Sequence, residues 1–286
     1  MKILIVGGTR FFGIPMVNRL IAHDHDITIA TRGNRPLSFD GSVEHVAMDR
    51  TDPQSVRTAL AGRSFDLIID KVAYSSNDVK HLLEHVSFER YIQMSTCSVY
   101  KDSHRDITED EFFAETYPLV WTERTEDYGE VKRQAERAAY EFADRSKCAF
   151  VRYPVVMGEH DYTGRLSFYV DHIRNRIPMV LEGQNSLTSF IHEKEAGEFI
   201  AYLAEHFACG PVNGCSRGAL KISEMIEYIE NKLGVKAVID AQGDPAPYNT
   251  DEGDMTFSSR KAESLGYRFS DIDAWIYRLI DLLCEQ

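Results

Sequence analysis

The sequence lacks any long apolar run that could cross a membrane. Its 286 residues include no stretch that approaches the roughly 20 consecutive apolar residues of a membrane-spanning helix. The first apolar segment, residues 3–6, is also too short for the hydrophobic region of a signal peptide, and it leads directly into a glycine turn. These absences predict a soluble, cytoplasmic protein without a membrane partner.

Cysteine is scarce, and its spacing disfavours two kinds of site. The cysteines are odd in number, and no two of them form a C-x-x-C pair. They are Cys97, Cys148, Cys209, Cys215 and Cys284. This pattern argues against a disulfide framework and a zinc site, and it is typical of a reducing compartment. We therefore expect no metal centre.

Basic residues are outnumbered. There are 32 Lys and Arg against 45 Asp and Glu, so the formal net charge is −13. An acidic protein repels a phosphate backbone at long range, which disfavours nucleic acid as a partner. The length fits one large α/β domain, or such a domain with a smaller annex.

Short apolar strands alternate with helices through the first half of the chain. We expect strands at residues 2–6, 26–31, 43–48, 65–70, 90–94 and 148–153, and helices at residues 12–22, 53–61, 77–85 and 126–145. This order is typical of a doubly wound parallel sheet with helices on both faces, the α/β Rossmann fold. We predict that residues 1–155 form a Rossmann domain that binds NAD(P).

After residue 155 the predicted strands are short and helices dominate. Helices are expected at residues 168–175, 193–204, 222–233 and 272–283, and a proline-rich loop at residues 244–248. We interpret residues 156–286 as a smaller, mainly substrate-binding lobe, with some segments returning to the Rossmann domain.

A glycine turn separates the first strand from the first helix. Such a turn presents free N–H groups and the positive end of the helix dipole to a pyrophosphate. Gly7 would allow the tight turn, and Gly13 would allow the helix to pack closely on the strand. We predict that the turn binds a dinucleotide through Gly7, Thr9, Arg10, Phe11, Phe12 and Gly13.

The turn resembles the G-x-x-G-x-x-G motif of the extended short-chain dehydrogenases/reductases, the NAD-dependent epimerase/dehydratase family. Gly7 and Gly13 match, whereas Arg10 replaces the middle glycine, as in a branch that includes the chloroplast stem-loop-binding proteins. The resemblance spans nearly the whole chain and implies a nicotinamide dinucleotide cofactor. Arg10 either pairs with a cofactor phosphate, which we favour, or partly blocks the site.

The end of the second predicted strand contains no acid. NAD-selective Rossmann sites place an acid there to bind the ribose 2′-OH, but residues 30–35 read Ala-Thr-Arg-Gly-Asn-Arg. Arg32 and Arg35 could clamp a 2′-phosphate, so we favour NADP over NAD; as the alternative, both are solvated loop arginines. Asp49 either contacts the adenine, as in related enzymes, or caps the turn before Asp52.

A Tyr-x-x-x-Lys pattern joins Tyr128 to Lys132. Positions i and i+4 share a helix face, and the ammonium together with an oxidised nicotinamide would lower the pKa of the phenol towards neutrality. Proton transfer is efficient in that range. A second such pattern, Tyr228 to Lys232, lies in a late amphipathic helix, and we interpret it as structural.

The stretch from Met94 to Tyr100 supports the choice of Tyr128. It leaves the carboxyl end of the fifth strand, where doubly wound folds bind ligands, and it resembles the family's S-S-x-x-V-Y stretch. The resemblance implies that Thr96 hydrogen-bonds the reacting oxygen and that Lys132 holds the nicotinamide ribose. The alternative to a catalytic site is that these residues form a hydroxyl-rich strand end and a surface helix without a catalytic role.

Three further features bear on the cofactor and the reaction. Tyr153 and Pro154 resemble the segment beside the nicotinamide, although Pro154 could equally be a plain strand stop. Cys97-Ser98 stand where dehydratases of the family place Asp-Glu, so dehydration is disfavoured. The stretch up to His192 lacks the arginine with which family epimerases bind a nucleotide pyrophosphate, and His192 is interpreted as a packed core histidine.

These features predict an NAD(P)-dependent oxidoreductase or epimerase that acts on a sugar or nucleotide-sugar carbinol or carbonyl. The carbinol carbon would lose hydride while Tyr128 takes the hydroxyl proton. The alternatives are a non-catalytic dinucleotide- or RNA-binding relative and a cofactor-sensing regulator. The resemblance also implies a homodimer formed through the tyrosine-bearing helix. The substrate lobe offers four candidate anion contacts, which are Arg165, His172, Arg174 and Arg176.

Overall fold

The buried apolar strands of the first half pair into one parallel sheet of seven strands. The computed structural model describes residues 1–248 and 253–286. The strand order is β11-β6-β5-β4-β1-β2-β3. Their bounds are β1 Lys2–Val6, β2 Asp26–Thr31, β3 Glu44–Ala47, β4 Ser64–Asp70, β5 Ser87–Thr96, β6 Cys148–Tyr153 and β11 Gly210–Asn213. This sheet confirms the predicted Rossmann fold.

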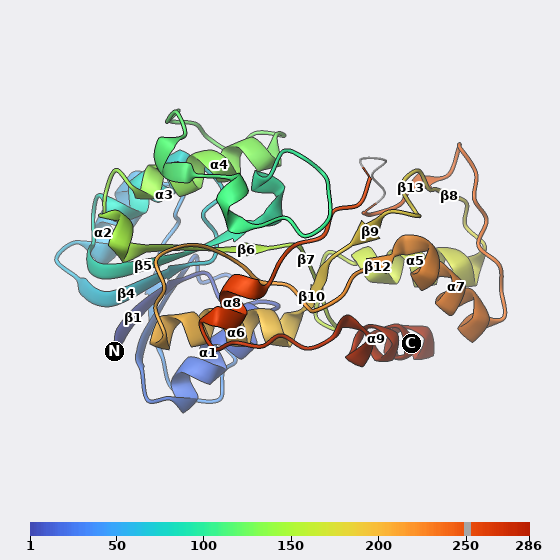
Figure 1. Cartoon of the computed structure of the whole chain (residues 1–286). Coiled ribbons are helices and arrows are strands. Elements are labelled where there is room, and N and C mark those ends of the chain that lie inside the picture. The colour runs from blue at the N-terminus through green and yellow to red at the C-terminus, as the bar shows by residue number, and fades with distance from the viewer. Residues whose placement is uncertain (249–252) are drawn as a thin grey trace.

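Helices cover both faces of the sheet (Figure 1). One face carries α1 (Gly13–Ala22) and α6 (Glu193–Glu205), and the other carries α2 (Pro53–Leu60), α3 (Ser76–Leu83) and α4 (Tyr128–Ala139). Because side chains alternate along a strand, Ile3 and Ile5 of β1 face α1 while Leu4 and Val6 face the other layer.

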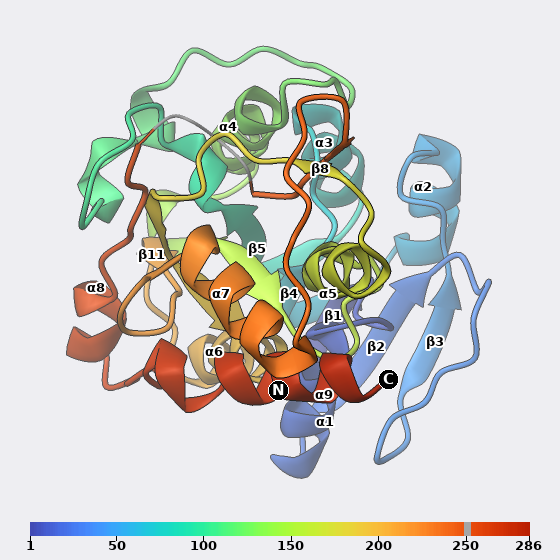
Figure 2. The ribbon, with the colours of Figure 1, turned by 90° about the vertical axis from the view of Figure 1, so that its right-hand side faces the viewer.

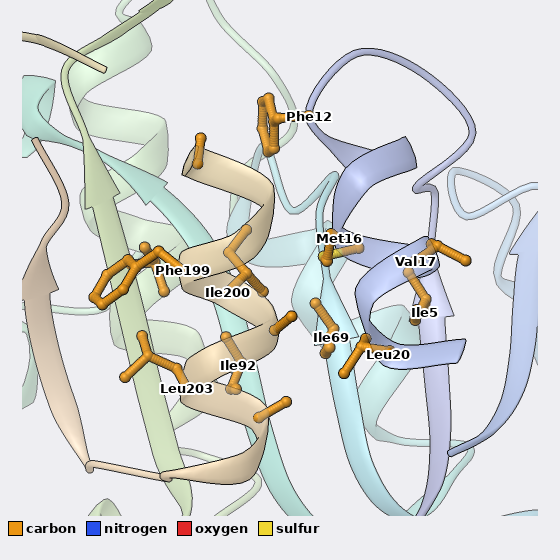
Figure 3. Packing of buried hydrophobic residues seen from close by; sticks show 14 of the residues in the cluster. Ile5, Phe12, Met16, Val17, Leu20, Ile69, Ile92, Phe199, Ile200 and Leu203 are labelled. Atoms are coloured by element: carbon orange, nitrogen blue, oxygen red, sulfur yellow. The ribbon is translucent and has the colours of Figure 1, made fainter. Parts of the chain in front are cut away.

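Figure 3 shows the core on the α1 side. Apolar side chains of the two helices meet those of three neighbouring strands there. They are Met16, Val17 and Leu20 of α1, Phe199, Ile200 and Leu203 of α6, and Ile5, Ile69 and Ile92 of the sheet. The layer therefore joins the first helix of the chain to a helix that begins 180 residues later.

The remaining segments form a lobe beside the carboxyl edge of the sheet (Figure 2). It has its own hydrophobic core, built mainly by α5 (Arg165–Asn175), α7 (Ile222–Leu233) and α9 (Ile276–Glu285). The short α8 (Arg260–Ser264) lies near β11. The short strands are β7 Val155–Met157, β8 Met179–Val180, β9 Leu187–Thr188, β10 Phe190–His192, β12 Leu220–Lys221 and β13 Asp244–Pro245.

Three predicted elements need correction. The sequence did not predict β11, because the Gly-Pro start of this strand is typical of turns. Proline is tolerated there because β11 is an edge strand. The helix expected to run to residue 145 ends at Ala139, since Phe142 turns back to pack on Trp121 with ring centroids 6.2 Å apart. The expected loop 244–248 begins with β13, which pairs with β8.

A membrane span requires a helix that is both long and apolar. Within residues 1–248 and 253–286, no helix combines the length and the apolar character needed to cross a bilayer.

Candidate functional site

Two connected cavities open at the carboxyl ends of the central strands. One of about 310 Å³ lies over the glycine turn, and we call it the turn cavity. The other, of about 530 Å³, lies at the ends of β5 and β6, and we call it the tyrosine cavity. Lys71, Tyr74 and Tyr162 line both, so the two cavities form one continuous cleft. This is the edge at which doubly wound folds bind ligands.

The turn cavity is lined by five of the ten residues predicted to bind the dinucleotide. These are Gly7, Thr9, Arg10, Arg32 and Asp49. Asp49 Oδ1 also accepts hydrogen bonds from the Thr51 backbone N–H at 3.0 Å and from Thr51 Oγ1 at 2.7 Å, which is the capping role of the alternative interpretation. Arg35 is exposed and lies outside the lining of both cavities.

Gly13 begins α1 and acts through packing. A Cβ atom at this position would lie 2.6 Å from the carbonyl oxygen of Gly8, so only glycine lets the helix start this close to the turn. Phe11 and Phe12, just before it, line the tyrosine cavity, and Phe11 adopts φ +54°, which is uncommon for a bulky residue. The turn therefore presents polar groups to one cavity and two aromatic rings to the other.

Arg10, which replaces the middle glycine of the motif, is held by an aromatic ring. Its guanidinium carbon lies 3.5 Å from the centroid of the Tyr162 ring, which is a cation–π contact. Tyr162 precedes α5 and also makes an edge contact with Phe11 at 6.3 Å between ring centroids. Arg10 thus bridges the glycine turn to the lobe across the cleft while its side chain lines the turn cavity.

Lys71 is a functional candidate that sequence reasoning missed. It directly follows β4, and its Nζ lies 3.7 Å from the centroid of the Phe12 ring. Burial, together with the nearby charges of Arg10 and Lys132, lowers the pKa of Lys71 to about 8. Among the described residues, no carboxylate lies within salt-bridge distance of this ammonium. The only signal in the sequence was a charged residue at the carboxyl end of a buried strand.

A buried ion network supports the floor of the turn cavity. Arg50 Nη1 lies 2.5 Å from Asp70 Oδ1, and its Nη2 donates to the Asp78 carbonyl oxygen at 2.6 Å. Arg124 Nη2 lies 3.2 Å from Asp78 Oδ2, and its guanidinium sits 4.5 Å from the Tyr74 ring centroid. Five cations and one acid line the cavity; they are Arg10, Arg32, Arg50, Lys71, Arg124 and Asp49. The wall is therefore basic in a protein of net charge −13.

The predicted catalytic side chains Thr96 and Tyr128 both line the tyrosine cavity, together with Tyr153 and Pro154. Thr96 ends β5 and caps the short helix η1 (Cys97–Val99), since its Oγ1 accepts from the Ser98 backbone N–H at 3.1 Å. The same hydroxyl donates to Ser98 Oγ at 3.2 Å. Tyr153 donates from its hydroxyl to the Ala196 carbonyl oxygen at 2.5 Å, which fixes its ring in the wall.

Tyr128 is the first residue of α4 and approaches Thr96 because of the glycine that follows it. A Cβ atom on Gly129 would lie 2.6 Å from the Ser98 carbonyl oxygen, so α4 could not come this close with a larger residue. Tyr128 is 42% exposed because it faces the cavity. The hydroxyl itself is surrounded by protein groups, and this burial raises the pKa of Tyr128 to about 12. A hydrogen bond with Thr96 acts in the opposite direction and lowers the pKa.

Lys132 lies one turn further along α4 and is fully buried. Its Nζ donates to the carbonyl oxygens of Ala73 at 2.7 Å and Met94 at 2.8 Å. Burial lowers the pKa of Lys132 to about 8, against the attraction of Asp70 and Glu136. An ammonium has three N–H donors, so one has no acceptor among these carbonyl groups, and Lys132 lies outside the lining of both cavities.

A buried ion pair anchors α4 against the sheet. Glu136 and Arg152 have no exposed side-chain surface, and Glu136 Oε2 lies 2.7 Å from Arg152 Nη2. Glu136 Oε1 also accepts from Ser95 Oγ at 2.5 Å, which joins α4 to the strand that carries Thr96. The sequence contained no local pattern for this pair, because its partners lie on different elements.

The second Tyr-x-x-x-Lys pattern lies outside both cavities. The Tyr228 hydroxyl and the Lys232 Nζ bind the same Asp281 Oδ1, at 3.1 Å and 2.9 Å, and so join α7 to α9. His192 packs on Trp275 with ring centroids 5.2 Å apart, and its Nδ1 accepts from the Lys194 backbone N–H at 3.2 Å. The second Tyr-x-x-x-Lys pattern and His192 therefore both make contacts that give them a structural role.

Comparison with known proteins shows the family of the chain and one relative that it matches over most of its length. The family model described as the NAD dependent epimerase/dehydratase family matches residues 3–214. The chain is 27% identical over 252 residues to 2′-dehydrokanamycin reductase from Streptomyces kanamyceticus, a match that covers 82% of this chain and 67% of that protein.

Two further similarities concern a plant protein and a solved structure. The chain is 32% identical over 116 residues to the chloroplast stem-loop binding protein of 41 kDa b from Arabidopsis thaliana, covering 36% of this chain and only 31% of that protein. UDP-glucose 4-epimerase of Thermus thermophilus in complex with NAD superimposes with a TM-score of 0.69, covering 100% of this chain and 98% of that one. At 17% identity, this likeness shows the fold alone.

Proposed function

Because the chain belongs to the NAD-dependent epimerase/dehydratase family, we propose that it is an NAD(P)-dependent oxidoreductase or epimerase that acts on a sugar-related carbinol or carbonyl. The observation that carries the proposal is the continuous cleft. It runs from the glycine turn to Thr96 and Tyr128, so one elongated ligand can reach both.

The residues present fit a dinucleotide. The basic turn cavity suits the adenosine half with its phosphates, and the aromatic tyrosine cavity suits the nicotinamide half. Lys71 lines both cavities and has no carboxylate partner among the described residues, so we assign it, with Arg10, to the diphosphate. Arg10 then has the pairing role rather than the blocking one.

The chain's own groups supply binding and proton transfer. When bound, the nicotinamide supplies a hydride donor or acceptor. Thr96 and Tyr128 hold the reacting oxygen of the substrate, and the remaining N–H of Lys132 holds the ribose. Since the protein alone raises the pKa of Tyr128 to about 12, the phenol carries its proton at neutral pH, which is the form that protonates a carbonyl oxygen. The reductase activity for which the Streptomyces kanamyceticus relative is named favours a reductase over an epimerase.

The test is a titration of the full chain with NADP⁺ and NAD⁺, followed by turnover measurements on a panel of sugars with the oxidised dinucleotides and of ketosugars with NADPH and NADH. A reductase changes the absorbance of the nicotinamide in step with product, whereas an epimerase interconverts sugars without net change in it. The proposal fails if neither dinucleotide binds.

A second candidate is a non-catalytic dinucleotide- or RNA-binding protein, which the similarity to the chloroplast stem-loop binding protein favours. The net charge of −13 argues against RNA. Binding of a stem-loop RNA that weakens steeply with salt, without dinucleotide binding, would select this candidate.

We expect Arg32→Gln to weaken binding of NADP⁺ by about 10- to 100-fold and binding of NAD⁺ hardly at all, because a charge-assisted contact to a phosphate contributes about 1.5–3 kcal/mol. Isothermal titration calorimetry measures both affinities. Arg35→Gln is the matched control, since Arg35 lies outside the lining of the cleft. A wild-type protein that prefers NAD⁺ would contradict our choice of cofactor.

We expect dinucleotide affinity to be constant below about pH 8 and to fall at higher pH. Lys71 and Lys132 each have a pKa of about 8 in the protein alone, and a bound anion raises the pKa of an ammonium beside it. Above about pH 8 binding therefore takes up a proton, and affinity falls by up to about tenfold per pH unit for each responding lysine.

Lys71→Met should reduce this pH dependence and weaken binding at neutral pH by about tenfold or more. Calorimetry between about pH 7 and 9 measures both effects. Lys194→Met is the control, because the Lys194 side chain is 71% exposed and remote from the cleft. Equal slopes for wild type and Lys71→Met would show that Lys71 does not face the diphosphate.

A further inference from the structure

One of the four candidate anion contacts of the lobe lines the tyrosine cavity, and that residue is Arg165. It is the first residue of α5, the helix that faces the sheet edge from the lobe (Figure 2). Its charge is close enough to Tyr128 to oppose the rise in the pKa of that phenol. Arg165 and the proposed catalytic hydroxyls of Thr96 and Tyr128 therefore line the same cavity.

A short turn fixes the inner end of the Arg165 guanidinium. Nε of Arg165 donates to Thr163 Oγ1 at 2.7 Å, and that hydroxyl donates to Asp161 Oδ1 at 2.6 Å. The nearest carboxylate oxygen, Asp161 Oδ2, is 3.8 Å from Nε, which is outside hydrogen-bond distance. The structure gives the two terminal nitrogens no acceptor among the described residues. Arg165 thus presents its fork, the part of a guanidinium that matches a carboxylate or a phosphate.

The other three candidates are engaged elsewhere or exposed. His172 stacks on Phe168 with ring centroids 3.6 Å apart, and its Nε2 lies 3.1 Å from Asp244 Oδ2. Arg174 Nη2 donates to the last carbonyl oxygens of α9, those of Leu283 and Cys284. Arg176 is the C-cap residue that follows α5, and it lies outside the lining of both cavities.

We propose that the substrate of this enzyme is a monosaccharide-sized carbonyl or carbinol that carries a carboxylate or a phosphate, and that Arg165 binds this anion. The inference rests on the proposed function. In it, the anion lies on the lobe side of the cavity while Thr96 and Tyr128 hold the reacting oxygen on the sheet side.

The composition of the cavity supports an anion. None of the described residues that line it is acidic, and its charged side chains are Lys71 and Arg165. The first turn of α5 adds to the positive potential, because Gly164 provides no side chain to cap its N–H groups. A volume of about 530 Å³ has to hold the nicotinamide end of a dinucleotide as well, which leaves room for a small sugar.

The experiment uses the full chain saturated with NADP⁺ and three sets of probes. The anionic probes are glucuronate and glucose 6-phosphate, which distinguish a carboxylate from a phosphate. The neutral probe is glucose, and the cationic probe is 2-amino-2-deoxyglucose. Calorimetry and thermal shift measure binding to wild type, Arg165→Gln, Arg165→Lys and Arg176→Gln, the last being the matched control at the other end of α5.

We expect at least one anionic probe to bind wild type more tightly than glucose. Arg165→Gln should weaken that binding by about 10- to 100-fold, Arg165→Lys should weaken it less, and Arg176→Gln should leave it unchanged. The inference would be overturned if glucose bound as tightly as the anionic probes, if the cationic sugar bound most tightly, or if neither anion bound at millimolar concentration. It would also be overturned if Arg165→Gln bound the anionic probe as tightly as wild type does.

NADP⁺ affinity is measured first in every variant, so the two proposals fail separately. If neither the wild type nor any variant binds the dinucleotide, the proposed function is wrong. If all bind it equally but show no anion preference, the function stands and only the assignment of Arg165 is wrong.

Discussion

Tyr128→Phe is expected to lower turnover by about two to four orders of magnitude while leaving dinucleotide affinity unchanged. The substitution removes one hydroxyl from the wall of the tyrosine cavity and keeps the ring. It therefore removes the group that exchanges a proton with the reacting oxygen, while Lys132 keeps its bonds to Ala73 and Met94. Single-turnover measurement of nicotinamide absorbance, beside a calorimetric titration, separates the two effects.

The chain offers a matched control for this experiment. Tyr228→Phe makes the same change in the second Tyr-x-x-x-Lys pattern, whose phenol bonds to Asp281 outside the cleft. We expect its turnover to equal that of wild type, with at most a small loss of stability. If both variants are fully active, proton transfer does not pass through Tyr128 and the catalytic assignment is wrong.

The Rossmann half of the fold was predictable because its signals are local. A strand such as Lys2–Val6, buried on both faces, reads as a continuous apolar run, and the turn after it needs glycine for reasons that act within a few residues. The same holds for Thr96 and Tyr128, whose positions follow from the strand end and the helix start. The edge strand β11 was missed because its four residues depend on pairing with β6, about 60 residues earlier.

The cleft was less predictable because its charges come from separate loops. Lys71 follows β4, Arg124 precedes α4 and Tyr162 precedes α5, and no spacing in the sequence relates the three. Only the assembled sheet brings them to one edge. The choice of Arg165 among four cations likewise depended on which side chains other groups had already engaged.

Glu136→Leu is expected to destabilise the protein by about 3–5 kcal/mol, because it leaves the Arg152 guanidinium buried without a counter-charge. Both side chains have 0% exposed surface, so water cannot replace the lost carboxylate. For a chain of this size the melting temperature should fall on the order of 10 °C, as measured by differential scanning calorimetry. Glu141→Gln is the control: Glu141 is 42% exposed and pairs with Arg137 on the surface, so its loss should cost at most about 1 kcal/mol.

The double variant Glu136→Leu, Arg152→Met tests the cause. Removing both charges eliminates the unpaired cation, so part of the lost stability should return, as for other buried pairs replaced by apolar residues. Recovery should stay incomplete, because Arg152 also donates to the carbonyl oxygens of Glu109 and Phe112 at 3.1 Å and 3.0 Å. A double variant less stable than Glu136→Leu would mean that these carbonyl contacts, rather than the ion pair, account for most of the stability that Arg152 contributes.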